Sequence, residues 1–223
     1  MPSVLAQPAQ SLTDLALGVV TLVLAVRLRR SRAAHSHWRV AFGWFGAAAL
    51  AGAVHHGVIV RWQQWADVSW GAISMMVVVA VSYLLAGTIA EVLGPGRWRA
   101  FWLLRSVGIV AYLVVVASGH AGIATILACE GLTMVSVLAL WTWAARRRHP
   151  LARPVLLAIG ASVAAAGLNA LSPGVLAALG LDRTSAYHLA QIGGMVLLYV
   201  AVSGPDRPGL EVAAAAPHRY AAA

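Results

Sequence analysis

The stretch VAFGWFGAAALAGAVHHGVIV, residues 40–60, decides the fold class of this chain. It contains no Asp, Glu, Lys, Arg or Pro. Its length is close to the roughly 20 residues that a helix needs to cross about 30 Å of hydrocarbon. No regular alternation of apolar and polar residues runs through it, as a half-buried strand would require. The stretch therefore predicts a transmembrane helix that carries two histidines, His55 and His56, near one end.

The whole chain has the composition of a multi-pass membrane protein. Of its 223 residues, 61% are hydrophobic and only 10% are charged, and its mean hydropathy is +0.79. Apolar segments can be marked at approximately Ser11–Leu28, Val40–Val60, Val68–Ala90, Phe101–Ser118, Ala121–Ala145, Val155–Leu171 and Thr184–Ser203. Because backbone groups in lipid must be hydrogen-bonded internally, these segments predict an all-α, polytopic membrane protein with seven transmembrane helices.

Arginine placement orients the predicted bundle, since cytoplasmic loops collect positive charge. The arginines that flank segments on one side are Arg27, Arg29, Arg30, Arg32, Arg39, Arg97, Arg99, Arg105, Arg146, Arg147, Arg148 and Arg153. The opposite side holds Arg61 and Arg183. We therefore expect the N-terminus outside and the C-terminus inside, in the plasma (inner) membrane. Residues 1–10 would be a short outer segment, residues 11–203 the transmembrane domain and residues 204–223 a disordered cytoplasmic tail.

Topology also explains the net charge of +9, so we expect no nucleic-acid partner. Tryptophans near the segment ends resemble the aromatic belts of membrane proteins. Those at predicted outer ends are Trp62, Trp65 and Trp70, and those at predicted inner ends are Trp38, Trp98, Trp102, Trp141 and Trp143. We expect these tryptophans to lie at the two membrane–water interfaces.

Polar residues gather in the predicted outer half of the membrane. At about 1.5 Å of rise per residue, His55 and His56 lie about 6–8 Å below the outer end of their segment, and His188 lies about 6 Å below that of the last segment. The other members of this outer cluster are Asp14, Asp67, Asn169 and Gln191. Such a cluster suits a site whose partner is the bilayer, a lipid or a small molecule from the outer side.

Helical geometry sorts this cluster further. Adjacent helical residues are about 100° apart, so only one of His55 and His56 is expected to face the bundle. His188 and Gln191 are spaced i, i+3 and share a face, which suits a ligand with a supporting partner or a simple interhelical hydrogen bond.

Two carboxylates have open interpretations. Ser11 and Asp14 have the S-x-x-D spacing of a capping box, and that role is the simpler interpretation of Asp14. Glu130 lies about 13 Å down the fifth segment, nearer the bilayer centre, and whether it joins the outer cluster is left open.

The stretch GAVHHGVIVRWQQWAD, Gly52–Asp67, resembles the second-helix region of alkaline ceramidases and the wider CREST group of seven-helix membrane hydrolases. In that group a histidine is followed eleven residues later by an aspartate, as His56 is by Asp67, and His188 resembles one of two helix-seven histidines. The resemblance implies a zinc-bound water that attacks a lipid amide. It implies a metal site of His56, His188 and Asp67, with Asp67 as the orienting residue. The supporting polar residues would be His55, Asp14, Asn169, Gln191 and Glu130.

Two features depart from this pattern. The serine that the group carries four residues before the helix-two histidine falls on Gly52, and Thr184 and Ile192 break the helix-seven H-x-x-x-H pattern around His188. A catalytic zinc usually has three protein ligands. The candidates for a missing ligand are Asp14, Asn169 and Gln191. The stretches TDLALGVV, residues 13–20, and YHLAQ, residues 187–191, also resemble uncharacterised bacterial seven-helix relatives of the group, which imply no activity.

Two classes of function stay open. One is a CREST-like, metal-dependent hydrolase of a lipid amide or ester. The other is a non-catalytic or degenerate relative, a ligand sensor or an assembly subunit, and the two departures favour it slightly. Haem held by His56 and His188, and transport, are less favoured alternatives.

Overall fold

The computed structural model describes residues 4–31, 36–119, 123–167 and 182–204. Its helices are α1 (Pro8–Leu28), α2 (Ser36–Gly57), α3 (Gln63–Val92), α4 (Trp98–Ala117), α5 (Ile123–Arg146), α6 (Ala152–Gly167) and α8 (Arg183–Ser203), with a 3-10 turn η1 (Ile59–Arg61). Each α-helix overlaps one of the predicted apolar segments, so the all-α prediction is confirmed. Asn169 and the tail from residue 205 lie outside the described residues.

Five of the described helices are long and apolar enough to cross a membrane. They are α1, α3 and α8 over their full lengths, α4 over Trp98–Val115 and α5 over Ala128–Arg146. α6 is apolar but has only 16 residues, and α2 is not among the five. Length and composition therefore indicate a membrane-embedded protein with several apolar helices.

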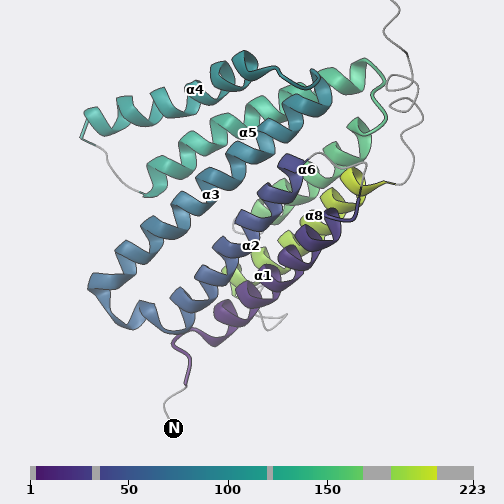
Figure 1. The fold of residues 1–223 in the computed structure, drawn as a ribbon. Coiled ribbons are helices and arrows are strands. Elements are labelled where there is room, and N and C mark those ends of the chain that lie inside the picture. The colour runs from purple at the N-terminus through teal and green to yellow at the C-terminus, as the bar shows by residue number, and fades with distance from the viewer. Residues whose placement is uncertain (1–3, 32–35, 120–122, 168–181, 205–223) are drawn as a thin grey trace, which may run out of the picture.

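Six helices form a closed ring in the order α1, α2, α3, α5, α6 and α8, and α8 packs back onto α1 (Figure 1). α4 lies outside this ring, at the edge next to α5 (Figure 1). Large apolar side chains stay exposed along α4, among them Trp102, Leu103 and Val114. Such a surface suits hydrocarbon, where an exposed leucine or valine has no hydrophobic cost. The ring also brings the first and last described helices side by side.

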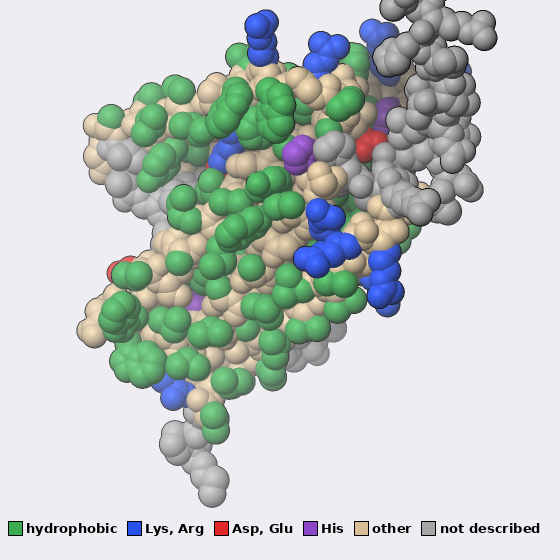
Figure 2. Space-filling model, in the orientation of Figure 1, with side chains coloured by type: hydrophobic (Ala, Val, Ile, Leu, Met, Phe, Trp, Pro, Cys, Tyr) green, Lys and Arg blue, Asp and Glu red, His purple; other side chains and the backbone are tan. Residues whose placement is uncertain are grey.

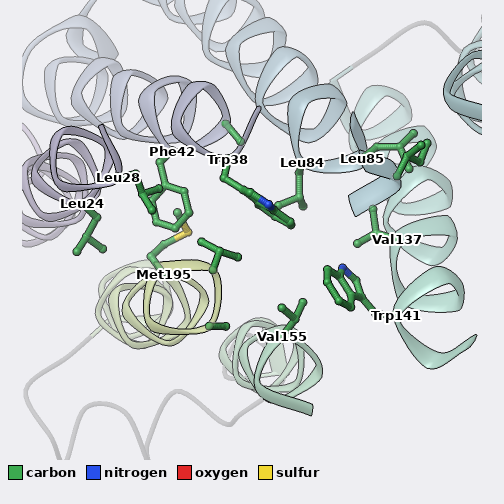
Figure 3. Close-up of a cluster of buried hydrophobic side chains, with 14 of the residues drawn as sticks. Leu24, Leu28, Trp38, Phe42, Leu84, Leu85, Val137, Trp141, Val155 and Met195 are labelled. Atoms are coloured by element: carbon green, nitrogen blue, oxygen red, sulfur yellow. The ribbon is translucent and has the colours of Figure 1, made fainter. Parts of the chain in front are cut away.

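The hydrophobic core lies in the half of the ring where α1 ends and α2 begins. Figure 3 shows Trp38, Trp141, Val155 and Met195 around its centre. Trp38 and Trp141 are 0% exposed, and Trp141 Nε1 donates to Thr88 Oγ1 at 3.1 Å. These two side chains are therefore part of the core and do not belong to an exposed aromatic belt, contrary to the prediction. Of the other tryptophans expected in the belts, Trp62, Trp65, Trp98, Trp102 and Trp143 are exposed, and Trp70 is half-buried.

α1 and α2 approach closely because each presents a glycine to a leucine of the other. A Cβ atom at Gly18 would lie 2.6 Å from Leu50 Cδ2, and one at Gly46 would lie 2.7 Å from Leu22 Cγ. Small residues at such contacts let helix backbones come together, as is common in membrane helices. Asp14 lies one turn before Gly18, so this contact holds its carboxylate against the last turns of α2.

Candidate functional site

Asp14 lies between His56 and His188, and the three residues come from α1, α2 and α8. Asp14 Oδ2 is 3.8 Å from His56 Nε2, and Asp14 Oδ1 is 3.3 Å from His188 Nε2. All three residues are buried, with relative exposures of 5%, 7% and 8%. We call these three residues the Asp–His cluster.

A hydrogen bond to Gln7 determines how His56 presents its ring. His56 Nδ1 lies 2.6 Å from Gln7 Oε1, an oxygen that can only accept. Nδ1 therefore carries the hydrogen, and Nε2 of the neutral ring turns a lone pair toward Asp14. The backbone strengthens this arrangement, since Gln7 N donates to His56 O at 3.0 Å and Ala6 N donates to Gly57 O at 2.9 Å. These bonds use carbonyls that the end of α2 would otherwise leave unpaired.

A contact with Thr13 holds Nδ1 of the His188 ring, as Gln7 holds Nδ1 of His56. The Thr13 hydroxyl donates to the backbone, with Ala9 O at 2.9 Å and Gln10 O at 3.1 Å. Thr13 Oγ1 can therefore accept a hydrogen from His188 Nδ1, 3.2 Å away, when that nitrogen carries it. In that tautomer, His188 Nε2 also turns a lone pair toward Asp14. Two imidazole lone pairs and one carboxylate converge, an arrangement that favours a cation between them.

The spacing within the cluster differs from that of a hydrogen-bonded group. Hydrogen bonds between nitrogen and oxygen are about 2.7–3.2 Å long. The 3.3 Å between His188 Nε2 and Asp14 Oδ1 is close to the roughly 3.3 Å that separates two ligands of a tetrahedral zinc. His56 lies farther out, and among the described residues no group of three or more His, Cys, Asp and Glu side chains is arranged to hold a metal ion. The cluster therefore supplies the donor atoms of a metal site, but His56 Nε2 lies 3.8 Å from Asp14 Oδ2, farther than two ligands of one zinc ion would.

Gly52 makes room for the Asp14 carboxylate. A Cβ atom at position 52 would lie 2.6 Å from Asp14 Oδ2, a distance that real Cβ atoms do not show. Gly52 is also the position where the resemblance to the membrane hydrolases places a serine. In this chain, an oxygen of Asp14 fills the space that a side chain at position 52 would need.

The capping-box prediction for Ser11 and Asp14 is wrong. α1 begins at Pro8, with Gln7 as its N-cap, so Ser11 already lies inside the helix. Proline is well suited to a first helical position, because its missing N–H has no partner there in any case. Ser11 Oγ donates instead to Ala53 O on α2 at 2.8 Å, which helps to align Asp14 with the histidines.

Asp67 is not brought to the histidines. It is exposed near the start of α3, and no hydrogen bond or ion pair links it to His56 or His188 in the described part of the chain. α2 ends at Gly57, and η1 turns the chain before α3 begins at Gln63. The eleven-residue spacing therefore runs around a turn, and the carboxylate between the histidines is that of Asp14.

His55 and His56 are both buried, contrary to the expectation that only one would face the bundle. His55 is 1% exposed, and its ring centroid lies 4.7 Å from that of Trp70 on α3. The Trp70 ring also lies against His56, at 5.6 Å. Both faces are covered because α2 lies between α1 and α3 in the ring. His55 Nδ1 has no hydrogen-bond partner among the described residues.

A cavity of about 300 Å³ lies in the middle of the ring. Its lining is mostly apolar, with Phe45, Val81 and Met134 among the residues, and Figure 3 shows other lining residues around the open centre. Tyr187 and Gln191 line it from α8, on either side of His188 in the sequence. Gln191 Oε1 is buried without a hydrogen-bond partner among the described residues. Gln191 thus belongs to the cavity, next to the Asp–His cluster.

Glu130 pairs with Arg105 and takes no part in the Asp–His cluster. Arg105 Nη2 donates to Glu130 Oε1 at 2.8 Å, and Nη1 donates to Thr133 Oγ1 at 2.9 Å. Arg105 and Glu130 are 4% and 7% exposed. The prediction that Arg105 flanks a segment end is wrong, because α4 begins at Trp98 and carries Arg105 two turns inside.

Comparison with known proteins gives a family without an assigned activity. No curated protein and no solved structure matches the chain. A family model described as a family of unknown function (DUF6962) matches residues 9–207, a span that includes Asp14, His56 and His188. Since this match covers most of the chain, the protein belongs to DUF6962, a family of unknown function.

Proposed function

We propose that this chain is an integral membrane protein whose Asp–His cluster binds one divalent transition-metal ion, with zinc expected, beside a cavity for an apolar ligand. The observation that carries the proposal is the pair of Nδ1 contacts, to Gln7 and Thr13, which suit the tautomers whose Nε2 lone pairs face one carboxylate. Imidazole and carboxylate are zinc ligands. Metal-binding histidines usually have their other ring nitrogen held by a hydrogen bond, as these two do.

The expected topology has seven spans, an outer N-terminus and an inner C-terminus, in the plasma (inner) membrane. The arginine distribution supports this orientation. The described arginines at the helix ends opposite the Asp–His cluster are Arg27, Arg29, Arg30, Arg39, Arg97, Arg99, Arg146, Arg147, Arg148 and Arg153. Those near the cluster end are Arg61 and Arg183. This orientation places the Asp–His cluster toward the outer side of the membrane.

The role we favour is ligand binding without hydrolysis. A divalent ion held by Asp14, His56 and His188 would supply Lewis-acid polarisation of an oxygen on the ligand. Gln191 Oε1 would accept a hydrogen bond from an N–H or O–H group of the ligand, because it is a buried acceptor that the described residues leave unpaired. Asp14 occupies the space where the membrane hydrolases that residues 52–67 resemble carry a serine. This supports a binding role over the hydrolytic one.

A second candidate function is hydrolysis of a lipid amide or ester. Its support is the donor set, because two histidines and one carboxylate leave the fourth position of a tetrahedral zinc open to water. The apolar cavity beside the cluster would hold the hydrocarbon part of such a substrate.

Elemental analysis of the purified protein, after incubation with zinc and gel filtration, tests the metal site. We expect about one zinc per chain in the wild type and less than about a tenth of that in Asp14→Asn, His56→Ala and His188→Ala. The matched controls Asp67→Asn and His37→Ala, which alter residues outside the cluster, should keep the wild-type zinc content. Near-zero zinc in the wild type, or equal zinc in all variants, overturns the proposal.

Turnover separates the two functions. Zinc-loaded protein is mixed with fluorescent N-acyl amide and ester lipids in detergent micelles, and product is measured for the wild type and for Asp14→Asn. Equal background rates support the binding role. Hydrolysis that Asp14→Asn abolishes would replace it with the hydrolase.

A further inference from the structure

We propose that a groove on the outside of the ring, between the end of α1 and the start of α2, binds an anionic phospholipid. The groove has a volume of about 480 Å³ and no residue in common with the Asp–His cluster. Apolar side chains form most of its walls, while Arg29 and Arg39 stand at the end nearest the helix termini. The lipid phosphate would lie between these two arginines, and an acyl chain would lie along α2 past Gly43.

Both arginines have guanidinium groups that no other described residue pairs with. Arg29 is the C-cap of α1 and Arg39 lies in the first turn of α2, and both are exposed. Neither forms an ion pair or a side-chain hydrogen bond with the described residues. No Asp or Glu occurs between residues 15 and 66, so neither helix supplies a carboxylate near the groove. Arginine forks bind phosphate oxygens with paired, charge-assisted hydrogen bonds.

The rest of the groove has the chemistry of a site for a hydrocarbon chain. Val26 and Trp44 are 52% and 38% exposed there. A Cβ atom at Gly43 would meet nothing within 4 Å, so the glycine leaves open space on the surface of α2. Figure 2 shows basic side chains near the end of α1, above a surface covered mainly by hydrophobic side chains.

The adjoining charged and apolar parts decide the class of ligand. A free phosphate would leave the apolar walls exposed, and a neutral lipid would leave both guanidinium groups without a counter-charge. An anionic phospholipid satisfies both parts, and basic sites between membrane helices at the inner side are typical of such lipids. The inference rests on the membrane topology proposed above and is independent of the metal site.

The test uses the full-length protein in nanodiscs that contain equal amounts of phosphatidylcholine and phosphatidylglycerol. Native mass spectrometry after release from the nanodiscs counts the lipids that each variant retains. Arg29→Gln/Arg39→Gln removes the headgroup contacts, and Gly43→Trp fills the open space while keeping both charges. The matched controls are Arg146→Gln/Arg153→Gln, which removes two exposed arginines elsewhere, and Gly131→Trp, because a Cβ atom at Gly131 also meets nothing within 4 Å.

We expect the wild type and both controls to retain phosphatidylglycerol over phosphatidylcholine. Retention should fall about tenfold in Arg29→Gln/Arg39→Gln and in Gly43→Trp. Equal retention of the two lipids by the wild type overturns the proposal. So does an equal loss in the arginine control, which would indicate a general effect of surface charge. Full retention by Gly43→Trp would mean that the groove holds no chain.

Discussion

The carboxylate of Asp14 and the α-carbon of Gly52 leave no space for a side chain between them, since an added Cβ would lie 2.6 Å from Asp14 Oδ2. Asp14 is on α1 and Gly52 is on α2, so the contact joins the two helices at the level of the Asp–His cluster. A side chain at position 52 would displace the carboxylate of Asp14 from its present place. The absence of a side chain at position 52 is thus tied to the aspartate on α1.

Gly52→Ala should destabilise the protein, although alanine is the better helix former. Overpacking against Asp14 is expected to cost about 1–3 kcal/mol of the free energy of unfolding. Gly43→Ala on the same helix is the matched control, because nothing lies within 4 Å of its Cβ, and it should stabilise by about 0.5–1 kcal/mol. Thermal unfolding in detergent measures both. Shifts of the same sign and size would contradict the close contact.

Gln7→Ala should weaken zinc binding without removing a ligand. Its Oε1 holds His56 Nδ1 at 2.6 Å, and the loss of such a supporting hydrogen bond typically lowers metal affinity about 10- to 100-fold. Competition with a fluorescent chelator gives the dissociation constant. The exposed Gln64 provides the control, and Gln64→Ala should bind zinc as the wild type does. Wild-type affinity in Gln7→Ala would show that Gln7 does not orient the ring.

The Arg105–Glu130 pair should respond differently to single and double replacement. Glu130→Gln leaves Arg105 as an uncompensated buried charge, and breaking such pairs costs about 3–5 kcal/mol. The double variant Arg105→Met/Glu130→Met removes both charges. Its free energy of unfolding should lie within about 1 kcal/mol of the wild-type value. Unfolding in SDS, followed by tryptophan fluorescence, compares them. Equal loss in the single and double variants would mean that the pair is needed for more than charge balance.

Asp182 should make stability depend on pH at the acidic end. Burial raises the pKa of this carboxyl, but hydrogen bonds from Ser185, Thr184 and Gln10 outweigh that effect and lower it below 3.8. A carboxyl with a lowered pKa in the folded state contributes stability above its unfolded value. That contribution is lost as the pH falls through the folded pKa.

Asp182→Ala should therefore lower stability by about 1 kcal/mol at pH 7, as loss of an N-cap does, and the gap to the wild type should close below pH 3.8. Melting temperatures of the two proteins from pH 7 to pH 3 measure the gap. A gap that stays constant over this range would rule out the carboxylate as the stabilising species.

The helices could be predicted because hydrocarbon allows few alternatives. A long apolar run such as Gln63–Val92 has to be helical, and its approximate position follows from composition. The residues at which helices begin and end are harder to predict from the sequence, because they depend on local contacts. Pro8 starts α1 earlier than the S-x-x-D pattern suggested, and Trp98 starts α4 early enough to bury Arg105. Trp38 and Trp141 follow the belt pattern in the sequence, but the ring closes over both side chains.

The candidate site was predictable in its histidines but not in its carboxylate. His56 and His188 stand out because they share a depth, and depth follows from helical rise. Asp67 follows His56 by eleven residues, yet the turn at η1 separates them. Asp14 reaches the histidines only because α1 packs against both α2 and α8, a tertiary contact that no local pattern contains.

The closing of the ring by α1 and α8 has a consequence for biogenesis. Asp14 and His56 enter the membrane early in synthesis, whereas His188 is translated only after more than 130 further residues. A nascent chain that ends before His188 lacks one side of the Asp–His cluster. The cluster is therefore complete only after α8 has been synthesised and has packed against α1.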